Sequence, residues 1–229
     1  MSSYYEEKLA AERLKRCYDI APPRVKQYLN AEIVHVLGSM KTGRTVLELG
    51  CGYGRVLVRL AEKAGSLVGI DISRVSLLLA RRTMSAYPDC LLVQADAVRL
   101  PFQDRSFDLV ACIQNGISAF HSDNRLLIGE SVRVTKHGGK VLFSSYSDKF
   151  WNHRLEWFRL QAREGLLGEF DEEKAKNGVI ECKDGFEATT VRPKDFLSLT
   201  AGLDAEVRLE EVDESSLFCE IVPRRSPAS

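Results

Sequence analysis

The chain has 229 residues, of which 45% are hydrophobic and 28% charged, and 32 basic side chains balance 32 acidic ones. This balance is typical of one globular domain, and a net charge of zero argues against a protein that binds nucleic acid by neutralising phosphates. The six cysteines show neither a C-x-x-C pair nor the spacing of a zinc site, so we expect reduced thiols and no bound metal. No apolar run approaches the roughly 18 residues of a membrane span, and the first residues do not form a signal peptide, which predicts a cytoplasmic location.

The N-terminal part of the chain predicts two helices. Residues 4–18 carry apolar side chains at helical spacing, with charged residues on the opposite face. Pro22 and Pro23 interrupt this pattern, and a second amphipathic pattern follows to about Met40. We therefore expect two helices ahead of the main domain.

From residue 45 the chain alternates between strand and helix patterns. We expect strands at 45–49, 67–71, 91–94, 107–112 and 140–145, with helices at 54–64, 74–86 and 122–134 between them. Such alternation requires an α/β fold with a parallel sheet covered by helices. Beyond it we expect an aromatic-rich helix at 148–165, a helix from Pro193 to about Gly202, and two strands at 204–211 and 216–222.

The turn after the first strand contains three glycines separated by single residues, Gly50, Gly52 and Gly54. Glycine lets the backbone adopt φ > 0 and approach a ligand closely. Glu48 stands two positions before the loop, where a carboxylate would repel a pyrophosphate but suit an ammonium or sulfonium group. The spacing also differs from the G-x-G-x-x-G of dinucleotide-binding folds. Asp71 ends the second strand, where it can accept hydrogen bonds from both hydroxyls of a ribose.

The segment from Glu48 to Gly54 closely resembles the first motif of the class I S-adenosylmethionine (SAM) methyltransferases, E/D-x-G-x-G-x-G, and Asp71 resembles their ribose-binding acid. The two closing strands resemble the antiparallel hairpin that ends the sheet in this family. The resemblance covers about residues 43–146 and 190–222. It implies a Rossmann-like, seven-stranded, mostly parallel sheet with a C-terminal antiparallel hairpin and helices on both faces.

The resemblance also implies a division of the chain. Residues 43–229 would form the SAM-binding domain, with an acceptor-side insertion at about 147–189. Residues 18–28 resemble a lid found ahead of the first strand in small-molecule methyltransferases, so we expect an N-terminal helical lid over residues 1–42. The alternative is two helices packed on the sheet with tyrosines at its rim. The lid side chains expected at the cofactor are Tyr18, Arg24 and Tyr28.

Mapped position by position, the motif implies a set of cofactor contacts. Beneath the methionine part of SAM we expect Glu48, Gly50, Cys51, Gly52 and Gly54, and beside the ribose and adenine Asp71, Ile72, Asp96 and Ala97. Asp96 would accept from the exocyclic amine of adenine, although a turn or helix cap is the alternative. Gln114, after the fourth strand, would meet the methionine end. We interpret Cys51 as a packing residue rather than a nucleophile.

Candidate catalytic groups follow the ends of the fourth and fifth strands: Asn115, His121, Tyr146 and His153. His121 stands where a general base could lie, and its alternative is a surface or capping residue. One face of the aromatic-rich helix must be core. The other, with Arg154 and Trp157, would line the pocket of a small acceptor that carries a carboxylate, or else is core as well.

We therefore expect a SAM-dependent methyltransferase that transfers a methyl group to an N, S or O atom of a small molecule by direct in-line displacement. It would use no metal and no membrane partner, and would be a monomer or homodimer. No Asp/Asn/Ser-Pro-Pro-Tyr/Phe sequence follows the fourth strand, which argues against DNA and protein-amide acceptors. The alternatives are an RNA or protein methyltransferase, a non-catalytic SAM- or nucleotide-binding module and, more distantly, an NAD-dependent dehydrogenase.

Overall fold

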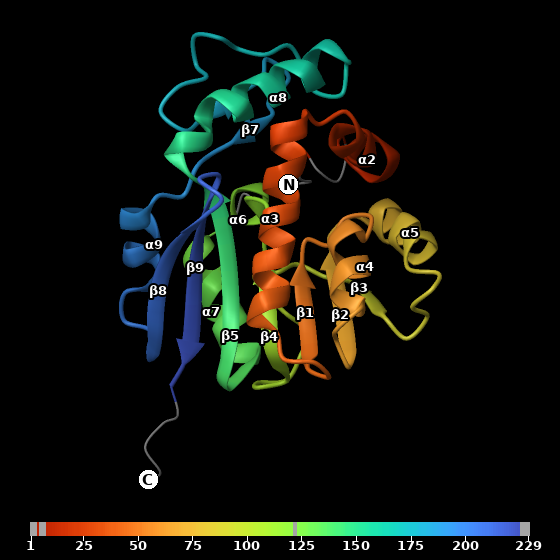
Figure 1. Ribbon diagram of the computed structural model, residues 1–229, viewed down its shortest axis with the longest axis vertical. Helices are drawn as coiled ribbons and strands as arrows, with labels where there is room; N and C mark the ends of the chain where they lie inside the picture. The colour runs from red at the N-terminus through yellow and green to blue at the C-terminus, as the bar shows by residue number, and fades with distance from the viewer. Residues whose placement is uncertain (1–3, 5–7, 121–122, 225–229) are drawn as a thin grey trace.

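The computed structural model describes residue 4, residues 8–120 and residues 123–224 (Figure 1). Its centre is a seven-stranded sheet with the order β3-β2-β1-β4-β5-β9-β8. The strands are β1 (Thr45–Leu49), β2 (Ser66–Asp71), β3 (Leu91–Gln94), β4 (Phe107–Cys112), β5 (Thr135–Tyr146), β8 (Ala205–Val212) and β9 (Ser216–Pro223). Neighbours from β3 to β5 run parallel, and β9 is antiparallel to both β5 and β8. The predicted Rossmann-like fold class and its C-terminal hairpin are thereby confirmed.

Helices cover both faces of the sheet because side chains alternate along each strand. Val46, Leu109 and Leu142 pack toward one face, which is covered by α3 (Pro23–Ser39), α4 (Arg55–Ala61) and α5 (Arg74–Thr83). Their sequence neighbours Leu47, Val110 and Phe143 pack toward the other, covered by α6 (Gly116–Ala119), α7 (Asn124–Val134) and α9 (Pro193–Thr200). The sheet therefore separates two apolar cores. Loops form its edge at the carboxyl ends of the parallel strands, where ligands bind in open α/β sheets.

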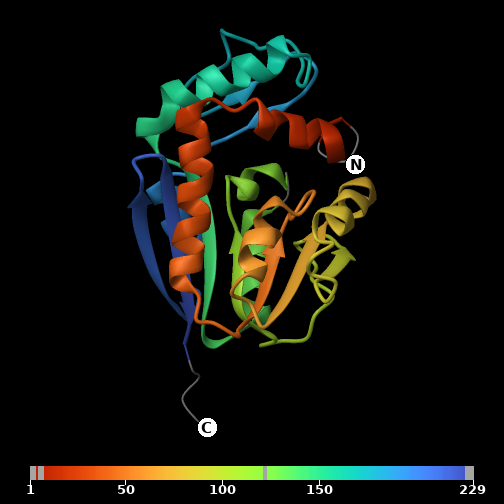
Figure 2. The same ribbon diagram turned by 45° about the vertical axis from the view of Figure 1, so that its right-hand side comes forward.

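A third layer lies over the carboxyl ends of the parallel strands. It contains α2 (Ala11–Asp19), the short helix η1 (Asp148–Phe150), α8 (Trp151–Arg163) and the small sheet of β6 (Ile180–Glu181) and β7 (Glu187–Ala188). Figures 1 and 2 show α2 and α8 close together above that edge. A separate apolar core joins these elements to the upper part of α3. We call α2, η1, α8, β6 and β7 the cap.

The boundaries that differ most from the predicted ones belong to the first helix and to β5. Residue 4 is helical and residues 5–7 lie outside the described part, but residues 8–10 are not helical and α2 begins at Ala11, so the single helix predicted for residues 4–18 is interrupted. Strand β5 begins at Thr135, directly after α7, rather than at residue 140. The pair Gly138-Gly139 does not precede the strand but forms an irregularity inside it, where the β4–β5 register shifts. Gly138 has a φ of +71°, a conformation that glycine adopts without strain.

Candidate active site

A cavity of about 350 Å³ lies between the carboxyl ends of β1, β2 and β4 and the cap. It occupies the edge at which ligands bind in open α/β sheets. The structure brings most of the predicted site residues to its lining: Tyr18, Tyr28, Glu48, Gly50, Cys51, Gly52, Asp71, Ile72, Asp96, Ala97, Gln114, Asn115 and Tyr146. One cavity therefore joins the glycine loop to the underside of the cap.

Three other predicted residues do not line the cavity, and a fourth, His121, lies outside the described residues. Gly54 is the N-cap of α4, with a φ of +87°, and serves the turn rather than the cavity lining. Arg24 pairs with Asp213 in the β8–β9 turn, 2.7 Å from its carboxylate. His153 is 46% exposed on α8 and is not part of the cavity lining, and His121 lies outside the described residues. Neither Arg24 nor His153 therefore belongs to the lining of the cavity.

Asp71 organises the glycine loop. Its Oδ2 accepts a hydrogen bond from the Gly52 amide at 2.8 Å, and its Oδ1 accepts from the Ser73 amide at 2.8 Å. Gly50 and Gly52 have φ values of +69° and +52°, in the left-handed region that favours glycine. The carboxylate predicted to hold a ribose is thus fixed in place by the backbone of the loop beside it.

Glu48 supplies a buried carboxyl group at the end of β1. It is 4% exposed, and burial raises its pKa to about 8 against the opposing effect of Arg55. Its Oε2 has no hydrogen-bond partner among the described residues. Because a buried carboxyl oxygen normally has a partner, a cationic group of a ligand would complete this site. Arg55, which the sequence reading missed, lies over the Tyr18 ring at 4.3 Å and also binds the Gln114 side chain.

The loop after β3 carries the residues predicted for adenine. Ile72 and Ala97 line the cavity beside Asp96, and Ile72 keeps 39% of its surface exposed, as an apolar contact for a flat ring requires. The Oδ1 atom of Asp96 accepts from the Val98 amide at 3.1 Å. Asp96 therefore stabilises a turn, which was the alternative to an adenine contact, and it lines the cavity as well.

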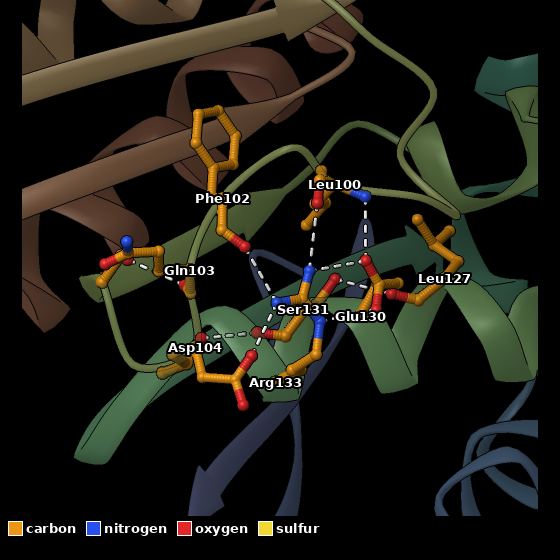
Figure 3. A network of polar contacts seen from close by, with 10 residues as sticks. Leu100, Phe102, Gln103, Asp104, Leu127, Glu130, Ser131 and Arg133 are labelled. Carbon is orange, nitrogen blue, oxygen red and sulfur yellow. Dashed lines mark hydrogen bonds and ion pairs between the residues drawn. The ribbon is translucent and has the colours of Figure 1, made fainter.

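Arg133 on α7 holds the rest of this loop against the domain (Figure 3). Its guanidinium donates to the backbone oxygens of Leu100 at 3.0 Å and Phe102 at 2.8 Å. The carboxylates of Glu130 and Asp104 accept further bonds from it, and the paired guanidinium lowers the pKa of Glu130. This network anchors the connection between β3 and β4 to α7.

Asn115 connects the end of β4 to the cap. Its side-chain Nδ2 donates to the Thr189 backbone oxygen at 2.9 Å, and its Oδ1 accepts from the Ser145 hydroxyl at 2.8 Å. Both ends of the amide are thus engaged within the protein. Asn115 and Gln114 each have a φ of 59°, a conformation uncommon outside glycine and sustained here by these contacts. We interpret Asn115 as a positioning residue rather than a catalytic one.

Glu32 on α3 is a second buried carboxyl group, and the sequence reading missed it. It is fully buried, and its Oε2 accepts from the Gln114 amide at 2.5 Å and the Ser144 hydroxyl at 2.8 Å. Burial raises its pKa to about 7, although these hydrogen bonds oppose the rise. In the sequence, the feature that could have pointed to Glu32 is an acidic residue among the apolar positions of an amphipathic helix.

The substitution Glu32→Gln should flatten the dependence of stability on pH. Because the pKa of Glu32 is raised on folding, the native state retains a proton that the unfolded chain has lost between about pH 4.5 and 7. This group therefore reduces the free energy of unfolding as pH rises through that window, by on the order of 3 kcal/mol. Urea unfolding at pH 4.5 and at pH 8 measures this effect. Between these two pH values the free energy of unfolding of Glu32→Gln should rise relative to that of the parent. The exposed control Glu173→Gln should follow the parent, and a parallel profile for Glu32→Gln would contradict the assignment.

The described part of the chain contains no cluster of three or more His, Cys, Asp or Glu side chains placed to bind a metal. Within residues 4, 8–120 and 123–224, no helix has the length and apolar content needed to cross a membrane.

Residues 46–139 match a family model described as a methyltransferase domain. Malonyl-acyl-carrier-protein O-methyltransferase of Erwinia billingiae is 35% identical over 121 residues, which are 53% of this chain and 46% of that protein. Demethylmenaquinone methyltransferase of Bacillus licheniformis is 33% identical over 109 residues, 46% of each chain. The chain thus spans less than half the length of these curated relatives.

Solved structures share the fold. The N-methyltransferase NodS of Bradyrhizobium japonicum, solved with S-adenosyl-L-homocysteine, aligns over 94% of both chains with a TM-score of 0.61 and 19% identity. The family match, the relatives and this fold agree with the resemblance drawn from the glycine loop, which is thereby confirmed.

Proposed function

We propose that this chain, whose residues 46–139 form a methyltransferase domain of the SAM-dependent class, is an enzyme that transfers the methyl group of SAM to a small molecule. The observation that carries the proposal is one continuous cavity. In it the glycine loop, Glu48 and Asp71 face residues of the cap across a space of about 350 Å³.

The residues present fit the cofactor. Glycines with positive φ form a loop that side chains would fill, and Asp71 is held ready for two hydroxyls. The unpartnered Oε2 of Glu48 suits the positive charge of the methionine end. Ile72 and Asp96 would contact adenine. When bound, SAM supplies a methyl group on a positively charged sulfur, and the chain's own task is to align the acceptor and exclude water.

We propose that the N-terminal helices act as a lid. Leu14 on α2 reaches across the cavity, since a Cβ added to Gly52 would lie 3.2 Å from its Cδ2. The Ala11 amide donates to the Ser76 hydroxyl on α5 at 3.0 Å, which ties the start of α2 to the cofactor side. These contacts support the division into residues 1–42, a domain at 43–229 and an acceptor-side insertion near 147–189. We also propose a cytoplasmic location, which the six free cysteines support.

The proposal is tested by following the methyl label. Purified protein is incubated with methyl-labelled SAM and either small-molecule fractions, total RNA or total protein. We expect label in the small-molecule fraction, and much less of it with the variant Asp71→Ala at the same SAM concentration. Label on RNA or protein would favour those acceptors instead. Binding of SAM with no transfer to any fraction would favour the non-catalytic binding module.

A further inference from the structure

The cap side of the cavity is lined by six aromatic rings: Tyr18, Tyr28, Tyr146, Trp157, Phe158 and Phe186. We call these six the aromatic wall. The rings contact one another, with centroids 5.9 Å apart for Tyr18–Trp157, 5.7 Å for Trp157–Phe158, 5.5 Å for Phe158–Phe186 and 5.4 Å for Tyr28–Tyr146. Aromatic rings attract cations as well as apolar groups. Arg55 already lies over the Tyr18 ring, and Arg154 lies over the rings of Tyr146 and Phe158. A cationic group bound beside the glycine loop would therefore be attracted chiefly by the rings of Trp157 and Tyr28.

The ionisable side chains around the cavity give an anionic acceptor no partner. The described lining contains three carboxyl groups, those of Glu48, Asp71 and Asp96, which are proposed to bind SAM, against one guanidinium, that of Arg55. Arg55 is already engaged by Gln114 and by the Tyr18 ring. Arg154, the expected anchor for a carboxylate, is 1% exposed, is not part of the lining and gives its donors to the backbone around residues 178–190. The lining thus offers a carboxylate-bearing acceptor no available cation.

The tyrosines of the aromatic wall are poor proton acceptors. Burial raises the pKa of Tyr28 and of Tyr146 above the ordinary value of 10, so both hydroxyls stay protonated. An alcohol acceptor needs a general base, whereas the lone pair of an uncharged amine attacks without one. These two tyrosines therefore offer a hydroxyl acceptor no general base, whereas an uncharged amine needs none.

One side-chain donor in the same lining has no partner. The Gln161 Nε2 finds no hydrogen bond among the described residues, and Gln161 is 3% exposed. An unsatisfied buried polar atom is costly, so a ligand group that pairs with it gains affinity. The Gln161 amide nitrogen is a donor and would take an ether, carbonyl or hydroxyl oxygen.

From these observations, and resting on the proposed function, we infer that the acceptor is an uncharged amine on an apolar body that carries an oxygen for Gln161. The nitrogen lone pair forms a bond to the methyl carbon, the carbon–sulfur bond breaks, and its electron pair stays on sulfur. The positive charge passes to nitrogen beside the aromatic wall. A tertiary amine keeps this charge as a quaternary ammonium, and a secondary amine then releases one proton to solvent.

The charge preference is tested by binding, without turnover. Protein saturated with S-adenosylhomocysteine is titrated with three molecules of matched shape: choline, the neutral 3,3-dimethylbutan-1-ol and the anionic 3,3-dimethylbutanoate. We expect choline to bind about tenfold more tightly than the alcohol, and the carboxylate to bind most weakly. Equal affinities, or a preference for the alcohol or the carboxylate, would overturn the inference.

Ring variants locate the binding. Trp157→Leu should abolish the preference for choline, whereas Trp157→Phe, which keeps a ring, should retain most of it. Trp151→Leu, a change on the same helix outside the cavity lining, serves as the matched control. Tyr146→Leu provides a second variant if Trp157→Leu does not fold. A choline preference that survives both wall substitutions would place the binding elsewhere and refute the assignment.

Turnover separates this inference from the proposed function. With SAM, we expect release of S-adenosylhomocysteine with 2-(dimethylamino)ethyl benzyl ether but not with benzyl alcohol or phenylacetate. Gln161→Leu should lower kcat/KM for this ether about tenfold and spare N,N-dimethylbenzylamine, which lacks the oxygen. Transfer to benzyl alcohol or phenylacetate alone would refute the amine inference and leave the proposed function standing. If neither SAM nor S-adenosylhomocysteine binds, the proposed function fails, and the amine inference fails with it.

Discussion

Replacing Asp71 with alanine is expected to weaken SAM binding by about 2–4 kcal/mol, roughly 30- to 1000-fold in Kd. The substitution removes the carboxylate proposed to accept from two ribose hydroxyls. It also deprives the Gly52 amide of its acceptor at 2.8 Å, so the glycine loop loses a contact that shapes it. The first effect acts on the bound state and the second on the shape of the loop before SAM binds, and calorimetric titration of SAM measures their sum.

Two further variants make this result specific. Asp71→Asn keeps one oxygen that can accept from the Gly52 amide, so its loss of affinity should be smaller. Asp89→Ala changes an exposed carboxylate beyond the end of α5 and should leave SAM affinity unchanged. Affinity of Asp71→Ala within twofold of the parent would contradict the ribose assignment.

The substitution Arg154→Leu should lower the free energy of unfolding by about 3–5 kcal/mol. The guanidinium donates to the Gly178 oxygen at 2.8 Å, the Thr190 hydroxyl at 2.7 Å and the Ala188 oxygen at 2.6 Å. It also lies 4.3 Å from the Tyr146 ring. Leucine would remove all three of these donors, leave the Gly178 oxygen with the Thr190 hydroxyl alone, and detach the strand pair β6–β7 from α8.

Urea unfolding measures this loss. Arg163→Leu, an exposed change in the last turn of the same helix, serves as the control and should cost less than about 0.5 kcal/mol. A loss below 1 kcal/mol for Arg154→Leu would show that Arg154 does not hold the cap together.

The sheet could be predicted because its signals are local. Each parallel strand is a short apolar run followed by a helical pattern, and the turn at 213–215 marks the final hairpin. The start of β5 could not be predicted in this way, because Gly138-Gly139 has the same sequence signature in a turn and in a bulge. What decides between them is pairing with β4, which a local pattern does not contain.

The cofactor half of the site was predictable for a similar reason, since a compact motif places Glu48, the glycines and Asp71 on adjoining strands. The acceptor half was not. Glu32 belongs to the site because it accepts a hydrogen bond from the amide of Gln114, 82 residues later in the chain. Arg154 resembled a carboxylate anchor in sequence, yet its donors bind main-chain oxygens that only the folded cap brings near.

The most direct test of the account is calorimetric titration of the unmodified protein with SAM, S-adenosylhomocysteine and NAD. The site described here predicts micromolar binding of the first two and no measurable binding of NAD, because Glu48 and the glycine spacing suit a cationic methionine end rather than a pyrophosphate. Binding of NAD alone, or of none of the three, would contradict the central claim.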